Sequence, residues 1–270
     1  EIHHFLHLKH DQSSFLALHE DSCLNVELPT FSSFCFTFLG TSNCHPTSTR
    51  STPGYLIQTK HGFIVIDCSN GFVQQLKRRF GPKTSKHILK HIKCVWISHR
   101  HFDHMSGLLD LLLKRAKILH KSKHDKHTLP IFCEPLINQL LEPIIQLYEN
   151  HYKISFHYQF HERSNPISID DVTIESFPVT HCEQSMGCLI SLDNGEKIAY
   201  TGDMLNDGKF VDAVKHCDYL ICESTYPKPI EKCIMHNHMC MEGANDLKDK
   251  LGAKYLFMVH FTPDYPIAEM

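Results

Sequence analysis

Short apolar runs separated by turn-forming residues recur from Phe34 onward, with longer amphipathic stretches between them. Apolar runs that are bounded by Gly, Pro, Asn or Asp are typical of strands. They predict strands at 34–39, 55–58, 63–67, 94–98, 131–133, 172–179, 187–192, 197–201, 218–222 and 254–259. Apolar residues spaced three or four apart predict helices at 71–80, 105–118, 136–150, 208–216 and 241–251. This order predicts an α/β (α+β) fold in which helices cover the outer faces of mixed sheets.

The ordered domain is predicted to begin near Phe34, because the residues before it are polar and lack a clear period. We expect residues 1–32 to form a lead-in or linker segment and residues 33–270 to form one domain. A hydrophobic content of 42% over 270 residues is enough for a substantial core. No apolar stretch approaches the roughly 20 residues of a membrane span, and residues 1–4 do not resemble a signal peptide. An intracellular protein without a membrane segment is expected, and nucleus, mitochondrion and cytoplasm all stay open.

Cysteine usage and charge argue against two other classes of protein. The 12 cysteines form no CxxC pair, and several lie in apolar runs, including Cys35, Cys94, Cys133 and Cys222. Buried reduced thiols are therefore favoured over a disulfide scaffold. The net charge of −3 is not that of a strongly basic nucleic-acid binder. A basic run at 77–93 is more often a solvated helix face, but it could form a local patch that attracts phosphate.

The segment Ser98-His99-Arg100-His101-Phe102-Asp103-His104 is the strongest chemical signal in the chain. It follows a predicted strand and precedes a predicted helix, so its side chains lie on a loop. Three imidazoles and a carboxylate would each need a partner in a core, whereas neutral imidazole and carboxylate are ligands that zinc accepts. One loop could supply half the ligands of a two-metal site, an arrangement suited to phosphodiester hydrolysis. A chance surface cluster is the alternative, since the chain contains 23 histidines.

Three later strand ends carry further candidate ligands. His181 follows the run 172–179, Asp203 follows 197–201 with Gly202 between them, and His260 follows 254–259. A lone His or Asp at a strand end is usually structural. Their recurrence at successive strand ends favours one shared site, because ligands of open sheets gather at one edge. Asp203 could bridge two metal ions.

The ordered set of these seven residues resembles the metallo-β-lactamase superfamily, whose fold is an αββα four-layer sandwich. The resemblance covers nearly everything from residue 34 onward, and it narrows to the tRNase Z family of tRNA 3′-processing endoribonucleases. Within that family, the chain is similar to the C-terminal catalytic half of the long form. The stretches that carry this similarity are Phe38-Leu39-Gly40-Thr41-Ser42, Pro46-Thr47-Ser48-Thr49-Arg50-Ser51, Asp67-Cys68-Ser69-Asn70-Gly71, Gly107–Arg115, Cys222-Glu223-Ser224-Thr225, His238-Met239-Cys240 and His260-Phe261-Thr262-Pro263-Asp264-Tyr265.

Some positions depart from the family's pattern. Ser48 stands in a Lys place, Ser51 in an Asn place, Asn70 in an acid place, Cys222 in a His place and Asp264 in an Arg place. The departures concern positions near the RNA rather than the seven metal ligands. A Gly-Pro-rich RNA-clamping arm is also not visible between Gly107 and His181, as in the catalytic half of the long form.

The resemblance implies a role for each candidate residue. His99, His101 and His181 would hold one Zn²⁺, Asp103, His104 and His260 would hold a second, and Asp203 would bridge them. Mn²⁺ or another divalent metal would also suit these ligands. A metal-activated water would cleave the 3′ trailer from precursor tRNA and leave a tRNA 3′-hydroxyl.

Other residues would assist this reaction. Asp103 counts as catalytic as well as metal-binding, and His238 paired with Glu223 would donate a proton to the leaving oxygen. Asp67 would orient a ligand histidine. Arg50 and Ser48 are weak candidates for substrate binding.

The expected partners are precursor tRNA and an N-terminal half of a longer chain that carries the clamping arm; a homodimer stays open. Two other functions fit part of the pattern. Another dinuclear metallohydrolase of this fold would act on a small ester, and fold alone does not exclude it. A non-catalytic RNA-binding half would keep the fold, yet its ligand positions would be expected to decay, and all seven are present.

Overall fold

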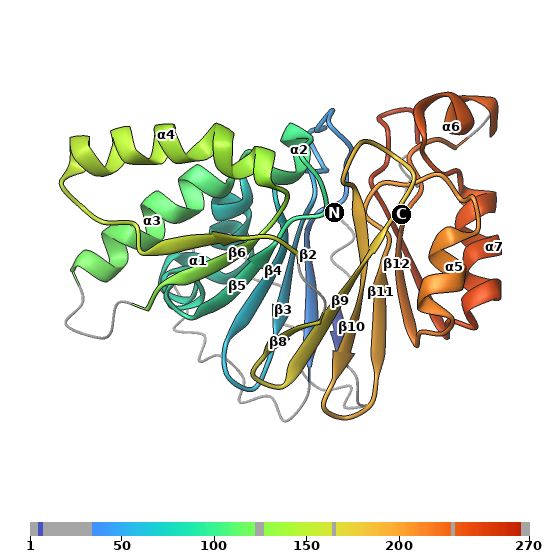
Figure 1. The fold of residues 1–270 in the computed structure, drawn as a ribbon, viewed down its shortest axis with the longest axis horizontal. Coiled ribbons are helices and arrows are strands. Elements are labelled where there is room, and N and C mark those ends of the chain that lie inside the picture. Colours follow the sequence, from blue (N-terminus) through green and yellow to red (C-terminus); the bar gives the residue numbers. More distant parts are fainter. Residues whose placement is uncertain (1–4, 8–33, 122–126, 164–165, 228–229, 266–270) are drawn as a thin grey trace.

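Two β-sheets lie face to face between two layers of helices in a computed structural model of the chain (Figure 1). The structure describes residues 5–7, 34–121, 127–163, 166–227 and 230–265. The αββα four-layer sandwich predicted from the sequence is confirmed.

Among the described residues, the first sheet has seven strands in chain order, so each strand pairs with the next one along the sequence. Its first four strands are antiparallel, and β4 to β7 are parallel. The parallel part needs crossover helices, which therefore lie on one face of this sheet. The strands are β1 (Phe5–His7), β2 (Cys35–Gly40), β3 (Gly54–Gln58), β4 (Phe63–Cys68), β5 (Ile92–Trp96), β6 (Leu129–Phe132) and β7 (Tyr158–His161).

The second sheet, in the part of the chain that the structure describes, has six strands in the order β13-β12-β11-β10-β9-β8. Strands β8 to β11 are antiparallel, whereas β11, β12 and β13 are parallel. Its strands are β8 (Ile167–Ile169), β9 (Val172–Pro178), β10 (Met186–Leu192), β11 (Lys197–Tyr200), β12 (Tyr219–Glu223) and β13 (Tyr255–Val259).

The helices form the two outer layers. Figure 1 shows α1, α3 and α4 beside the first sheet, and α5 and α7 beside the second. The helices are α1 (Phe72–Lys90), α2 (Phe102–Met105), α3 (Leu108–His120), α4 (Pro135–Tyr152), α5 (Lys209–Val214), α6 (Ile230–His236) and α7 (Met241–Leu251).

Three apolar layers hold the sandwich together. One lies between the first sheet and its helices, and one lies between the second sheet and its helices. The central layer joins the inner faces of both sheets and includes the fully buried Trp96. The Trp96 indole Nε1 donates a hydrogen bond to Ser176 Oγ at 3.1 Å, so the polar edge of this buried ring has a partner in the opposite sheet.

Most predicted elements are present, and the differences have local causes. The predicted helix 71–80 is present as the first part of α1, because Gly81, with φ 73° and ψ 167°, is not helical; a second helical stretch, which was not predicted, continues from Pro82 to Lys90. The predicted helix 105–118 corresponds to α3, which begins at Leu108, whereas the short helix α2 covers Phe102–Met105, most of which was predicted to lie on a loop. The short elements β7, β8 and α6 were not predicted, since they are too brief to show a period.

The lead-in prediction is partly outside the described residues. Phe5–His7 pairs antiparallel with β2, so this part of the segment is a strand and not the irregular structure that the sequence predicted. Residues 1–4 and 8–33 lie outside the described part of the chain. The division at residues 32 and 33 stays a prediction.

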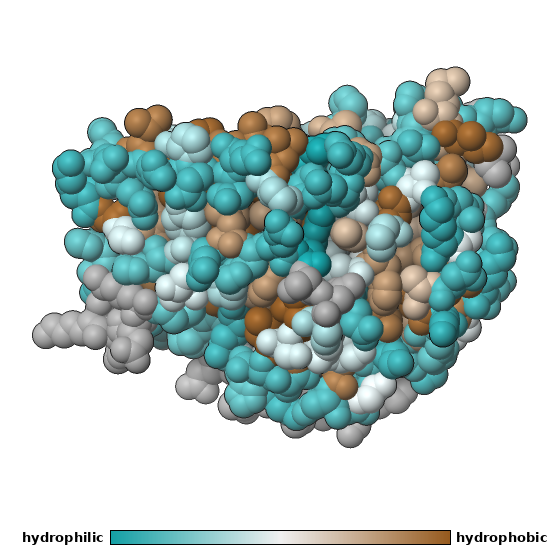
Figure 2. All heavy atoms as spheres, viewed as in Figure 1, coloured by the Kyte–Doolittle hydropathy of each residue, from teal (hydrophilic) through white to brown (hydrophobic). Residues whose placement is uncertain are grey.

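The described helices include no candidate membrane span, but one of them, α4, has an exposed apolar face. None of them is both long and apolar enough to cross a bilayer. Figure 2 shows apolar side chains along the outer side of α4, where Leu140, Ile144 and Leu147 are exposed. These side chains recur at spacings of three and four residues and therefore share one helix face.

Candidate metal centre

The seven predicted ligands meet at the edge of the sandwich where strands of both sheets end. His99 and His101 lie in the loop after β5, and Asp103 and His104 lie on α2. His181, Asp203 and His260 come from the segments that follow β9, β11 and β13. The αββα packing thus brings together residues that are up to about 160 positions apart.

The ligand atoms form two groups. In one, His99, His101, His181 and Asp203 each offer an atom within 4.8 Å of the others. In the other, Asp103, His104 and His260 do the same. This division is the one that the family resemblance implied.

Asp203 lies between the two groups. Its Oδ2 is 3.2 Å from His260 Nε2 and 3.3 Å from His104 Nε2, in the second group. The same oxygen is 3.7 Å from the Nε2 atoms of His99 and His181, in the first group. One carboxylate therefore faces imidazoles of both groups, as a bridging ligand would.

Several polar atoms of the centre fit a divalent cation. His99 Nε2 and Asp203 Oδ1 are buried and have no hydrogen-bond partner among the described residues. His181 Nε2 faces His101 Nδ1 at 3.1 Å. Buried polar atoms without partners, such as His99 Nε2 and Asp203 Oδ1, are costly, and a shared cation would satisfy them. The donor set of imidazoles and carboxylates therefore suits a divalent metal.

Hydrogen bonds to the outer ring nitrogens orient three of the imidazoles. His181 Nδ1 donates to the carbonyl of Asn237 at 2.9 Å, and His260 Nδ1 donates to Thr225 Oγ1 at 2.8 Å. His104 Nδ1 donates to Asp67 Oδ2 at 2.8 Å. Each bond fixes the tautomer that leaves Nε2 free to face the centre.

Asp67 is the hub of a fully buried network beneath His104. Its carboxylate also accepts hydrogen bonds from the Ser98 amide at 2.7 Å, the Ser98 hydroxyl at 2.8 Å and the Tyr200 hydroxyl at 2.6 Å. Asp67 has a φ of 53°, a conformation that costs a non-glycine residue free energy. These bonds offset that cost, so the predicted orienting role of Asp67 has a structural basis.

The charges of the centre favour neutral imidazoles in the first group. Burial lowers the pKa of His101 and of His181, and burial and the nearby His104 lower the pKa of His99 well below its usual value. Neutral imidazole is the form that binds metal. Burial also lowers the pKa of His104, but Asp203, Asp103 and Asp67 raise it overall. The same carboxylates would attract a cation to this position.

His238 lies beside the second group and is paired with Glu223. Its Nδ1 donates to Glu223 Oε1 at 2.9 Å, and its ring stacks on His260 with a centroid distance of 5.4 Å. Thr225 Oγ1 lies between them: it donates to Glu223 and is the acceptor for His260 Nδ1. His238, Asp203 and His260 also form a possible third metal-binding group. The predicted pair is thus in contact with the ligand shell.

A cavity of about 620 Å³ opens onto the centre. Its wall includes His101, Asp103, Asp203, His238 and His260, together with Asn43, His45, Asn70, Phe102 and Tyr226. Arg50 and Ser48 are not among its lining residues. The Arg50 guanidinium lies 5.1 Å from the centre of the Phe261 ring, and Ser48 is exposed nearby on the same loop.

The family departures fall at different depths. Ser51 and Asn70 line the cavity, and Asp264 is exposed. Cys222 is fully buried in the apolar layer behind the second sheet, where its Sγ donates to Met239 Sδ at 3.4 Å. Cys222 therefore packs away from the cavity.

Comparison with known families identifies the fold. The model of the beta-lactamase superfamily domain matches residues 63–261, which is most of the chain and includes all seven candidate ligands. The chain belongs to the beta-lactamase superfamily.

The relatives of this beta-lactamase superfamily chain include proteins named ribonuclease Z and tRNase Z. It is 30% identical over 228 residues to ribonuclease Z 2, mitochondrial, of Schizosaccharomyces pombe, covering 83% of this chain and 33% of that protein. A crystal structure of a long form RNase Z from yeast has a TM-score of 0.74 at 18% identity, with 91% of this chain and 40% of that chain covered. The human short form tRNase Z has a TM-score of 0.70 at 24% identity, with coverage of 85% and 93%.

The similarity in sequence to proteins named ribonuclease Z and tRNase Z confirms the resemblance to the tRNase Z family that the sequence motifs predicted. The chain spans about a third of the length of the curated relatives that it matches. The two structural similarities are evidence for the fold alone.

Two residues of the centre were not predicted from the sequence. Tyr200 was assigned only to a strand, although it stands three residues before Asp203 and its hydroxyl donates to Asp67. Phe102 was passed over between two ligands, although its ring lines the cavity. Its position as a bulky aromatic residue between two predicted ligands could have indicated that Phe102 lies at the centre.

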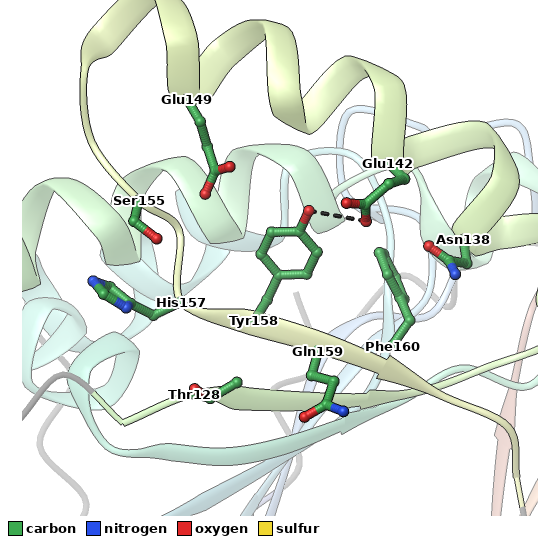
Figure 3. A pocket seen from close by; sticks show the side chains of 9 residues that line it. All are labelled: Thr128, Asn138, Glu142, Glu149, Ser155, His157, Tyr158, Gln159 and Phe160. Carbon is green, nitrogen blue, oxygen red and sulfur yellow. Dashed lines mark hydrogen bonds between the residues drawn. The ribbon is translucent and has the colours of Figure 1, made fainter.

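A second cavity, of about 590 Å³, lies between α4 and β7, away from the candidate ligands (Figure 3). The Tyr158 hydroxyl donates to Glu142 Oε2 at 2.9 Å within it. Glu149, on the same helix, accepts a hydrogen bond from the Phe156 amide. Its acidic side chains are thus engaged in holding α4 against the edge strand.

Proposed function

We propose that this chain is a zinc-dependent endoribonuclease that removes the 3′ trailer from precursor tRNA and leaves a 3′-hydroxyl on the tRNA. The observation that carries the proposal is the position of Asp203 Oδ2, within 3.7 Å of imidazoles in both ligand groups. Such a shared carboxylate supports a dinuclear centre, and dinuclear centres suit phosphodiester cleavage. The similarity to a protein named ribonuclease Z supports tRNA as the substrate.

The proposed ligands divide as the geometry does. His99, His101 and His181 would hold one ion, Asp103, His104 and His260 would hold the other, and Asp203 would contact both. Two divalent ions held there would neutralise charge on the scissile phosphate and lower the pKa of the attacking water. Zinc is proposed because imidazole and carboxylate are among its usual ligands, and Mn²⁺ is the alternative.

His238 is the proposed proton donor to the leaving ribose 3′ oxygen. Its Nδ1 is engaged by Glu223, so its Nε2 is the atom available for transfer. Glu223 is fully buried and accepts three further hydrogen bonds, from the amides of Met204 and Met239 and from the Thr225 hydroxyl. The carboxylate is therefore held in place and in turn orients the imidazole.

Partners and location follow as parts of the same proposal. A longer chain with an N-terminal half would supply additional grip on the RNA, since the relatives are about three times as long. The S. pombe relative is named as mitochondrial, and a mitochondrial location is proposed for this chain. A homodimer stays a prediction.

The test compares two classes of substrate on the zinc-loaded protein: precursor tRNA with a 3′ trailer, and small thioesters, lactones and sulfate esters. We expect endonucleolytic cleavage of the RNA at the trailer, with a 3′-hydroxyl detected by ligation or polyadenylation. Asp103→Ala should abolish cleavage. Asp110→Ala is the matched control, because this carboxylate is partly exposed on α3, pairs with Lys114 and does not line the cavity.

Two results would contradict the proposal. Hydrolysis of small esters without RNA cleavage would indicate another metallohydrolase of the same fold. Binding of precursor tRNA that is unaffected by Asp103→Ala, with neither zinc nor cleavage, would indicate a non-catalytic RNA-binding half.

A further inference from the structure

Phe102 is an exposed aromatic residue inside the metal-binding motif. It lies between His101 and Asp103, and its side chain is 73% exposed while lining the cavity over the metal centre. Isolated exposed apolar residues are common on protein surfaces. This one is next in sequence to two candidate ligands, His101 and Asp103, and lines the same cavity as they do.

The ring of Phe102 has no aromatic or cationic partner among the described residues. Tyr226, the other large aromatic residue of the cavity, differs: its ring lies 6.0 Å from the rings of His236 and His238, and Lys232 Nζ lies 5.8 Å from its centre. Tyr226 is also half-buried. Phe102 therefore presents the aromatic surface that is open to a ligand.

The short helix that carries Phe102 is firmly held. Met105, one turn along, is buried, and the Gly107 amide donates to the Cys68 carbonyl at 2.8 Å. Ser106 Oγ accepts a hydrogen bond from the Asn70 amide at 3.1 Å. A rigid ring loses little conformational freedom when a flat ligand covers it.

The cavity, in its described lining, lacks Lys and Arg side chains that could hold RNA, so an aromatic ring could contribute to RNA binding there. No Lys or Arg is found among the described residues that line it. Bound metal ions would engage the phosphate, but they do not hold the bases on either side. Single-stranded RNA is commonly positioned by stacking its bases on aromatic side chains, which is tolerant of sequence because every base has a π-face.

We propose that Phe102 is a stacking platform for the nucleobase next to the scissile phosphate. This inference rests on the proposed RNA substrate and deepens it, because it assigns a residue to the positioning of the trailer junction. The stacked base would align the scissile phosphate with the metal centre. Loss of one such stack is expected to weaken RNA binding about tenfold.

The first experiment measures kcat and KM on precursor tRNA with Phe102→Ala, Phe102→Tyr and Leu147→Ala. Phe102→Ala should raise KM about tenfold, and Phe102→Tyr should restore it. Leu147→Ala is the control, since this side chain is 68% exposed on α4 and does not line the cavity. Equal KM values for wild type and Phe102→Ala would overturn the proposal.

A second experiment uses substrates that lack one base to test whether Phe102 acts by stacking on that base. Precursors are made with one abasic ribose, placed in turn at each nucleotide that flanks the cleavage site. At the stacking position, the abasic site should raise the KM of wild type and abolish its advantage over Phe102→Ala. An undiminished advantage at every position would overturn stacking.

A binding measurement separates this inference from the proposed activity. Phe102→Trp places an indole at the cavity, whereas the natural Trp96 is fully buried. A short single-stranded RNA should quench the new indole in the metal-loaded protein, even if trailer cleavage itself were absent. Cleavage by wild type without any quenching of the Phe102→Trp indole would overturn the stacking role. A change in the sedimentation of the protein on Phe102→Ala, without a change in RNA binding, would also overturn it, because the ring would then be part of a protein–protein contact.

Discussion

The Nδ1 of His238 donates a hydrogen bond to the fully buried carboxylate of Glu223, whose Oε1 is 2.9 Å away. Burial alone lowers the pKa of His238, but the Glu223 carboxylate raises it to about 9. Below that pH the imidazole is protonated, which is the state that a proton donor needs. The two residues lie 15 positions apart, and only the path from β12 to α7 brings them together.

Replacing Glu223 by Gln should therefore disable His238 without removing it. The pKa of His238 should fall, because burial remains and the raising charge is lost; NMR titration of the metal-free protein measures this. Cleavage of precursor tRNA should slow about 100-fold or more. His238→Ala should slow it to a similar extent, and the double variant should be no slower than either. His236→Ala, an exposed neighbour on α6, is the control. Additive effects of the two substitutions would contradict the pairing.

Tyr200→Phe should weaken metal binding. The Tyr200 hydroxyl donates to Asp67 Oδ2 at 2.6 Å, and the same oxygen is the acceptor for His104 Nδ1 at 2.8 Å. Loss of one donor frees the carboxylate to shift and loosens the orientation of His104. Zinc affinity, measured by competition with a chelating dye, should fall about tenfold.

The control for that variant is Tyr219→Phe, whose hydroxyl donates to Glu196 at the end of the second sheet where β11 and β12 begin, opposite the end that carries the centre. It should leave zinc affinity unchanged. An equal affinity in Tyr200→Phe and wild type would mean that Asp67 holds His104 without help from Tyr200.

Gly107→Ala should destabilise the fold for steric reasons. A Cβ at Gly107 would lie 1.9 Å from the Ser69 carbonyl oxygen and 2.6 Å from its carbon, both of them backbone atoms that cannot move aside. The backbone of Gly107, at φ −81° and ψ −10°, is otherwise allowed for alanine. The free energy of unfolding should fall by about 3 kcal/mol in chemical denaturation.

Gly243→Ala is the matched control for this clash. Its nearest neighbour would be Met239 Cγ at 2.9 Å, which belongs to a flexible side chain. Alanine also favours the helix that contains this position by about 0.5–1 kcal/mol. A nearly unchanged stability is expected, and an equal loss in both variants would show that the Ser69 contact is not decisive.

Asp218 should make stability depend on pH in the acid range. Burial raises the pKa of its carboxyl, but the Lys254 ammonium at 2.8 Å and the Lys197 amide at 2.9 Å lower it overall from 3.8. A carboxyl whose pKa is lower in the folded state contributes stability above its unfolded pKa, and this is lost as the pH falls through the folded pKa. Asp218→Asn should cost about 1 kcal/mol at pH 7.

Measuring the free energy of unfolding at a series of pH values tests this prediction for Asp218. Unfolding free energies of wild type and Asp218→Asn should converge as the pH falls below about 4. Asp249→Asn, at a carboxylate with a side chain 82% exposed, should show no difference at any pH. A constant gap between wild type and Asp218→Asn down to low pH would assign the loss to packing rather than to charge.

Local patterns in the sequence predicted the strands and helices that carry the centre. Strand β9 and helix α7 were predicted with nearly their observed bounds, because each has a long, regular alternation of apolar and polar residues. The helix end near residue 80 was also predicted, since Gly81 and Pro82 interrupt the helix there, whereas the second part of α1, from Pro82 to Lys90, was not. Short elements such as β7 leave no such pattern.

The sequence by itself determined which chemical groups the site contains, because the ligand types and their places at strand ends are written along the chain. Tertiary structure decided what those groups do. The parallel register of β11, β12 and β13 places Asp203 between two sets of imidazoles, and the contact of Tyr200 with Asp67 joins the two sheets. The exposure of Phe102 likewise depends on how α2 packs against the turn after β4. These relationships join residues far apart in the chain, and their distances follow from the packing of whole sheets rather than from any local preference.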